Sequence, residues 1–200
     1  MSGHRSALVA ALAFVLCVAA LDAAPAKPLE TLRLAVIVND YAGAAPDVLE
    51  RAKSHVTFIY RVAGVEIDWI DGDDPRLGDD EFLKSIVTVS LYSAEMASRS
   101  TRQDSAVGRA AAGGRTVTVL YHRLEDVWGG RSAQAAYLLG NVIAHEIGHL
   151  VLPRGTHSPI GLMVPEMNIS TATSRSLFFT PEQGQIIRST LTAARRPARG

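Results

Sequence analysis

The spacing of apolar residues along the chain predicts alternating strands and helices. A mostly apolar run over residues 32–38 ends at Asn39 and Asp40, which is typical of a buried strand. From residue 46 to about residue 63 the apolar positions recur three and four apart, which predicts a helix, and Gly64 ends it. Residues 65–70 again favour a strand, so the chain opens with a predicted β-α-β unit.

Two more strands and two more helices are predicted further along. Residues 86–92 and 116–122 favour strands, with a glycine-containing loop between them. Residues 135–150 are strongly apolar and contain no proline, which predicts a long helix; Thr180 followed by Pro181 predicts the start of a C-terminal helix. The pattern therefore predicts a single α+β domain with a small, twisted, mostly parallel sheet.

The first 26 residues predict an export signal. A short basic start precedes an uncharged run over residues 7–21, and Ala24 and Ala26 supply the small side chains that a signal peptidase reads. This run is shorter than the roughly 18 to 20 apolar residues of a membrane span, so we expect no stable membrane insertion after signal removal. A secreted or periplasmic location is predicted. The expected divisions are a signal peptide (1–26), a folded domain (27–193) and a disordered basic tail (194–200).

The composition fits a folded domain and disfavours one class of partner. Hydrophobic residues make up 48% of the chain, and 20 basic residues balance 20 acidic ones. A neutral chain lacks the basic field that drives binding to nucleic acid, so no nucleic-acid partner is expected. The single cysteine, Cys17, lies in the predicted signal, so the mature chain is expected to contain no thiol.

An acidic segment follows the second predicted strand. Asp71 and Asp73 are spaced like alternate ligands of a calcium loop, but Pro75 occupies the next ligand position. A solvated acidic turn explains the segment better, and calcium is retained only as a weakly supported cofactor.

The strongest chemical signal is the segment NVIAHEIGHLVLPRGTH, residues 141–157. On a helix, His145 and His149 lie on one face, one turn apart, where both imidazoles can bind a single metal ion. Glu146 follows the first histidine and can reach a water molecule at that metal. Two histidines and a glutamate on an apolar helix are costly to bury without partners, so the pattern favours a metal site.

A catalytic zinc ion commonly takes three protein ligands, and His157 is the first candidate for the third. Pro153 disfavours helical geometry in the residue before it, and Gly155 suits a sharp turn, so the chain is expected to fold back and bring His157 to the metal. Two carboxylates remain open as alternatives: Glu166, in a predicted loop, and Glu182, at the start of the C-terminal helix.

The run HEIGHLVLPRGTH followed by SPIGLMVPE resembles the metzincin clan of zinc metallopeptidases, and its later part is particularly similar to matrixins. The resemblance implies one Zn²⁺ held by His145, His149 and His157, with Glu146 as general base. It also implies that Met163 forms a methionine-containing turn beneath the metal. The implied fold is a metzincin-like domain with a long active-site helix.

The sequence departs from the clan at one spacing. The third histidine usually follows the second by six residues, but His157 follows His149 by eight, so the loop is two residues longer. No tyrosine follows Tyr137, so a tyrosine ligand after the methionine is absent from this chain.

The resemblance implies a zinc metalloendopeptidase that acts on peptides or proteins, and the predicted export signal implies that it is secreted. An extended substrate is expected to pair with a sheet edge, for which the predicted strand 116–122 is the candidate, with His122 at its end. Two other functions stay open: an RNA-processing endonuclease, against which the signal and neutral charge count, and an inactive zinc-containing binding protein. The sequence establishes neither oligomeric state nor substrate specificity.

Overall fold

The computed structural model describes residues 31–99, 107–111, 114–128, 132–166 and 169–195, which belong to one compact unit beginning at Thr31. The predicted signal peptide and nearly all of the predicted basic tail lie outside the described residues. Within these ranges, no helix combines the length and the apolar character needed to span a bilayer.

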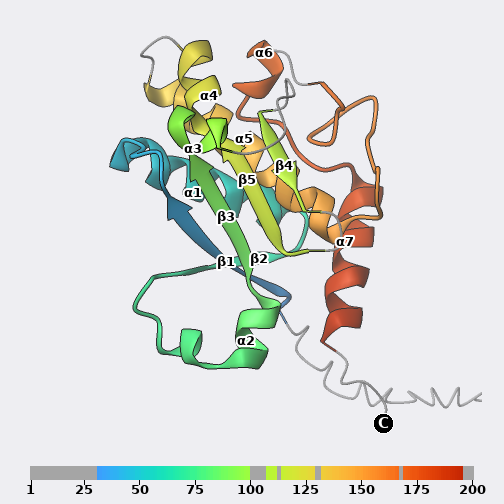
Figure 1. Cartoon of the computed structure of the whole chain (residues 1–200). Coiled ribbons are helices and arrows are strands. Elements are labelled where there is room, and N and C mark those ends of the chain that lie inside the picture. The colour runs from blue at the N-terminus through green and yellow to red at the C-terminus, as the bar shows by residue number, and fades with distance from the viewer. Residues whose placement is uncertain (1–30, 100–106, 112–113, 129–131, 167–168, 196–200) are drawn as a thin grey trace, which may run out of the picture. The chain divides into compact units, whose positions relative to one another are not determined.

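The described strands form one five-stranded sheet in the order β2-β1-β3-β5-β4 (Figure 1). All neighbouring pairs are parallel except β4 and β5, which are antiparallel. The prediction of a small, mostly parallel sheet is therefore confirmed. The strands are β1 (Arg33–Asp40), β2 (Glu66–Ile70), β3 (Val87–Tyr92), β4 (Gly108–Ala110) and β5 (Thr116–Leu120).

Helices α1 to α3 lie between the strands along the chain, and helices α4 to α7 come after the last strand, β5. A long helix, α5, and a C-terminal helix, α7, are present as predicted, so the predicted α+β architecture is confirmed. The helices are α1 (Pro46–Val62), the 3-10 turn η1 (Pro75–Gly78), α2 (Asp80–Ser85), α3 (Ala94–Ser98), α4 (Tyr121–Trp128), α5 (Ser132–Val151), α6 (Ile169–Ala172) and α7 (Pro181–Ala194).

Local sequence explains where α1 and α7 begin and end. Pro46 occupies the first turn of α1, where a missing backbone N–H costs nothing. Gly64 follows α1 with a φ of 81°, a conformation that favours glycine. The Thr180 hydroxyl accepts a hydrogen bond from the backbone N–H of Gln183, whose side chain in turn accepts from the Thr180 N–H, so a capping box starts α7.

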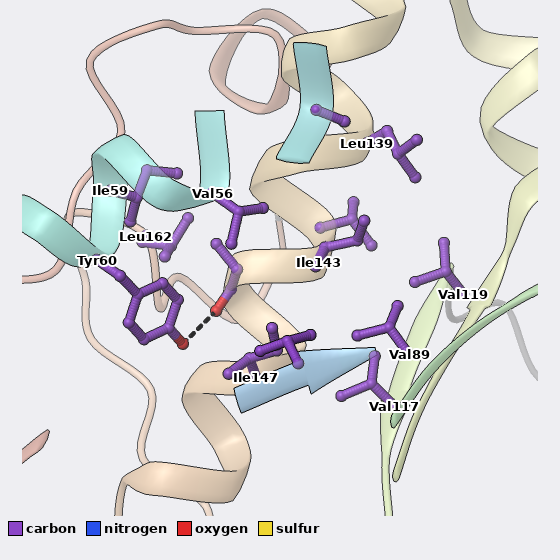
Figure 2. Packing of buried hydrophobic residues seen from close by; sticks show 14 of the residues in the cluster. Val56, Ile59, Tyr60, Val89, Val117, Val119, Leu139, Ile143, Ile147 and Leu162 are labelled. Atoms are coloured by element: carbon purple, nitrogen blue, oxygen red, sulfur yellow. Dashed lines mark hydrogen bonds between the residues drawn. The ribbon is translucent and has the colours of Figure 1, made fainter. Parts of the chain in front are cut away.

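The core lies between the sheet and the two long helices α1 and α5. Both helices are on one face of the sheet (Figure 1), and Val89, Val117 and Val119 point toward Ile143 and Ile147 of α5 (Figure 2). All five of these side chains are fully buried. This apolar layer holds α5 against the sheet, and so fixes the position of the histidines that α5 carries.

A buried tyrosine joins the two long helices. The Tyr60 hydroxyl of α1 donates a hydrogen bond to the carbonyl oxygen of Ala144 in α5 at 3.1 Å (Figure 2). The Tyr60 ring also contacts Phe179 edge to face, with 5.1 Å between the ring centroids. The middle of α5 is therefore supported directly beside His145.

The structure corrects the prediction for residues 116–122. Strand β5 ends at Leu120, and α4 begins at Tyr121, so His122 lies in a helix rather than at a strand end. Strand β5 is also interior, because β4 pairs with its outer side. The short strand β4 lies in a segment predicted to be a loop, and it forms this edge of the sheet.

The acidic segment consists of caps and ion pairs. Arg76 binds Asp68 and Asp74, each at 2.7 Å. The Asp74 carboxylate also accepts from the Arg76 backbone N–H, and Asp79 accepts from backbone N–H groups at the start of α2. These aspartates therefore have structural partners within the segment.

Candidate metal centre

Helix α5 presents two histidines on one face. It runs from Ser132 to Val151, and the spacing of His145 and His149 places their rings one turn apart, with 4.7 Å between centroids. Their Nε2 atoms are 3.1 Å apart. The predicted helix and the predicted juxtaposition of these two side chains are both present in the structure.

The turn after α5 brings a third histidine to the pair. Gly155 has a φ of 71°, and the Thr156 N–H and hydroxyl both donate to the carbonyl oxygen of Pro153, which closes the turn. The His157 ring then lies 4.9 Å from that of His149 and 5.7 Å from that of His145. The two additional residues of the loop are accommodated in this turn.

The three imidazoles form a cluster that suits one metal ion. One ligand nitrogen from each of His145, His149 and His157 can be chosen so that all three lie within 4.8 Å of one another. Two zinc–nitrogen bonds of about 2.0–2.1 Å at a tetrahedral angle place their nitrogens about 3.3 Å apart. The 3.1 Å separation of the His145 and His149 Nε2 atoms is close to that value.

A backbone carbonyl selects the tautomer of His145. Its Nδ1 lies 2.8 Å from the carbonyl oxygen of Leu162, which can only accept, so Nδ1 carries the proton. The Nε2 lone pair is then directed at the cluster, as in metal sites where a second hydrogen bond orients the ligand. Burial also lowers the pKa of His145, which favours the neutral form that binds metal.

The central histidine is also held in its neutral form. Burial is the largest cause that lowers the pKa of His149 to about 4, and the nearby imidazoles of His145 and His157 lower it further. His157 is the exposed member of the cluster, so the site opens to solvent on the side of the turn. The donor set therefore consists of three imidazole nitrogens with an open side, which is the arrangement of a catalytic zinc site.

Glu146 is buried beside this cluster under strand β4. Burial raises the pKa of its carboxyl group to about 7, against the opposing effects of the Ala110 N–H and the charge of Arg109. The Ala110 N–H donates a hydrogen bond to the carboxylate. Gly108 lies against the same side chain, because a Cβ at this position would be 2.6 Å from Cγ of Glu146.

The role of β4 was missed by the sequence interpretation. Its three residues carry no alternating apolar pattern, and the segment contains glycine, which favoured a loop. A glycine in an extended segment often marks a place where another group approaches the backbone closely. Gly108 is the sequence signal for the contact between β4 and Glu146.

Met163 packs directly beneath the metal-binding part of α5. It is fully buried, and a Cβ on Gly148 would lie 2.7 Å from the Met163 sulfur. The loop that carries it is closed by backbone hydrogen bonds from Ser158 to Met163 and from Leu162 to Phe178. The structure thus places Met163 next to the helix turn that carries His149, where the resemblance predicts a methionine turn.

The two alternative ligands lie outside the cluster. Glu166 is exposed after the methionine loop, and Glu182 occupies the first turn of α7, where backbone and Thr180 hydrogen bonds lower its pKa. Among the described residues, the group of potential metal ligands contains only His145, His149 and His157. His157 is therefore the third ligand that the geometry favours.

Solved structures of other proteins have a fold similar to that of this chain. No protein-family model and no curated protein matches the chain. An archaemetzincin from Methanopyrus kandleri matches 83% of this chain and 99% of its own at 14% identity, with a TM-score of 0.52. An archaemetzincin from Archaeoglobus fulgidus, crystallised with malonate, matches 76% and 99% at 13% identity, with a TM-score of 0.50.

A zinc-dependent peptidase from Methanocorpusculum labreanum also matches, at 15% identity over 79% of this chain and 99% of its own, with a TM-score of 0.49. The two archaemetzincin matches show that the chain has a fold similar to theirs. The finer similarity to matrixins stays a prediction from the sequence.

Proposed function

We propose that the chain is an exported zinc metalloendopeptidase that hydrolyses peptide bonds. One observation carries the proposal: His145, His149 and His157 converge in one cluster, and Glu146, the residue after His145 in α5, has a buried side chain. The similarity of fold to two archaemetzincins supports the assignment to peptidases, since their name places them among the metzincins.

Each proposed ligand has a defined task. His145, His149 and His157 would hold one Zn²⁺, and the Leu162 carbonyl would keep His145 in the tautomer that leaves Nε2 free to bind. When bound, zinc supplies Lewis acidity, which makes water more acidic and a peptide carbonyl more electrophilic.

Glu146 would act as the general base. Its carboxylate takes a proton from the attacking water and later delivers a proton to the leaving amine. The Ala110 N–H holds one side of the carboxylate, and Gly108 leaves the space in which the side chain lies. Strand β4 therefore positions the base from outside the metal-binding helix.

A peptide or protein substrate would pair with β4. This strand is an edge of the described sheet, so the backbone groups on its outer side, apart from the Ala110 N–H that donates to Glu146, are open to another extended chain. It also contacts Glu146 directly. Substrate pairing at β4 would therefore place the scissile bond near the base, in place of the pairing at residues 116–122 that the sequence suggested.

Export rests on the pattern of residues 1–26 alone. Expression in a secreting host, followed by mass spectrometry of the released protein, tests it. Cleavage near Lys27 is expected, and full-length chain retained inside the cell would contradict export.

The test of the activity compares the zinc-loaded protein with Glu146→Gln on a broad peptide library. The variant is expected to keep its zinc and to lose about 100-fold or more of kcat, because general base catalysis contributes roughly that factor. Chelation should abolish hydrolysis and added zinc should restore it. Zinc binding without cleavage of any peptide would favour the inactive binding protein.

A further inference from the structure

A cavity outside the metal centre lies between helices α1 and α5 and the segment that follows α6. Its volume is about 300 Å³, which is sufficient for a small organic molecule. Neither the three clustered histidines nor Glu146 lines it. Its walls consist of Arg51, Ser54, His55, Phe58, Ala136, Tyr137 and Arg175.

Helical spacing creates one wall of the cavity. The four α1 residues that line it are three and four apart, so they share one face of the helix. Gly140 of α5 allows this face to approach closely: a Cβ there would lie 3.0 Å from the Ala52 carbonyl oxygen and 3.1 Å from Cδ2 of His55. The His55 ring therefore packs against Gly140, where α1 and α5 are in contact.

The hydrogen bonds of Asn141 determine which nitrogen of His55 accepts. The Asn141 amide group donates to the carbonyl oxygens of Ala172 and Ser174, at 2.8 and 2.9 Å, so its oxygen faces His55. Nε2 of His55, 3.0 Å away, must then donate to that oxygen. Nδ1 lies on the ring edge opposite Cδ2. It has no hydrogen-bond partner among the described residues, and it is not fully buried, so it remains accessible.

Two guanidinium groups stand at the cavity. Neither Arg51 nor Arg175 forms an ion pair with a carboxylate in the part of the chain that the structure describes. Arg175 lies over the ring of Tyr137, 5.2 Å from its centroid, which holds the guanidinium beside the cavity. The cavity thus combines positive charge, one unpartnered acceptor nitrogen and the apolar surfaces of Phe58 and Tyr137.

We propose that this cavity binds a small organic acid in which a carboxylate neighbours a hydrogen-bond donor and the remainder is apolar. The carboxylate would pair with Arg51 and Arg175, whose planar groups suit charge-assisted hydrogen bonds. The donor would reach Nδ1 of His55, and the apolar part would pack on Phe58, Ala136 and Tyr137. Inorganic phosphate can pair with the two guanidinium groups but has no apolar part to pack on Phe58, Ala136 and Tyr137, so it should bind more weakly.

Three related probes test the proposal in the zinc-loaded full chain. N-benzoylglycine carries the carboxylate, the adjacent N–H and an aromatic ring; N-benzoylglycinamide lacks the charge, and N-benzoylsarcosine lacks the N–H. In NMR titrations, N-benzoylglycine should saturate and shift the ring resonances of His55 and Tyr137. The amide is expected to bind at least about tenfold more weakly and the sarcosine analogue several-fold more weakly.

Variants assign the binding to this cavity. Arg51→Gln and Arg175→Gln should each weaken N-benzoylglycine about tenfold and leave the zinc content unchanged, whereas Arg61→Gln, elsewhere on α1, should have no effect. Unchanged binding in the Arg51→Gln/Arg175→Gln double variant would overturn the proposal. So would the absence of saturable shifts up to about 20 mM, equally tight binding of inorganic phosphate, or shifts confined to the three clustered histidines.

Discussion

Gly108 lies so close to Glu146 that any side chain at position 108 would collide with the proposed base. A Cβ there would be 2.6 Å from Cγ and 2.8 Å from Oε1 of Glu146. Gly108→Ala should therefore displace the carboxylate and lower kcat by about tenfold or more, while the three histidines keep their zinc. Peptide hydrolysis and elemental analysis measure the two effects separately.

A matched substitution controls for the loss of a glycine. Gly72 has no atom within 4 Å of where its Cβ would lie, so Gly72→Ala should leave kcat unchanged. Wild-type kcat in Gly108→Ala would show that β4 does not fix the position of Glu146.

The exposed member of the histidine cluster is predicted to be essential for zinc. His157→Ala leaves two imidazoles, and we expect zinc affinity to fall by about 100-fold or more, with peptide hydrolysis lost in parallel. Competition with a chromogenic chelator measures the affinity. His122→Ala is the control, because His122 lies in α4 and outside the cluster.

Retention of full zinc and activity in His157→Ala would contradict the assignment of the third ligand. In that case Glu166→Gln and Glu182→Gln would be the next variants to measure, since these are the carboxylates that the sequence left open.

Local signals predicted the long elements of the fold. Helix α1 starts at Pro46 and ends before Gly64 because proline suits a first turn and glycine a left-handed turn. The same reasoning located α7 from Thr180 and Pro181. The pair His145 and His149 could also be predicted to share a face, because their spacing alone determines it on a helix.

The parts of the fold that the sequence pattern does not predict depend on contacts between distant segments. Strand β4 consists of three residues, and it is defined by pairing with β5 and by the contact of Gly108 with Glu146, none of which is local. The end of β5 was placed two residues too late because Tyr121 and His122 continue a strand-like pattern, although they begin α4. The secondary structure of these short segments is determined by tertiary packing rather than by the local propensity of their residues.

The contact between Gly148 and Met163 predicts an unusual effect of alanine in a helix. Alanine normally stabilises a helix interior by about 1 kcal/mol relative to glycine. At Gly148, however, the added Cβ would lie 2.7 Å from the Met163 sulfur and 3.0 Å from Cε1 of Phe179. Overpacking of this kind costs about 1–3 kcal/mol, so Gly148→Ala should lower the free energy of unfolding.

Urea unfolding of Gly148→Ala and Gly184→Ala tests this contact. Gly184 lies in α7, and its nearest neighbour would be the flexible Arg188 side chain at 3.4 Å, so alanine there should stabilise the protein. Equal stabilisation by both substitutions would mean that Met163 does not press on α5.

The buried His55 predicts a loss of stability in mild acid. Burial is the main cause that lowers its pKa below the ordinary value of 6.5, and the charge of Arg175 lowers it further, against the hydrogen bond to Asn141. Below pH 6.5 the unfolded chain therefore binds a proton at His55 more readily than the folded chain does. The stability due to this group is complete above pH 6.5 and is lost as the pH falls toward its folded-state pKa.

His55→Gln separates this contribution from those of His145 and His149, whose pKa values are also lowered. Glutamine can still donate to Asn141 Oδ1 but does not titrate, and the other histidines are present in both proteins, so their effects cancel in the comparison. The free energy of unfolding, measured from pH 7.5 to 5 without organic acids, should fall less steeply in the variant. Parallel curves for the two proteins would show that His55 takes up its proton equally well in the folded and unfolded chain, which its burial between α1 and α5 should prevent.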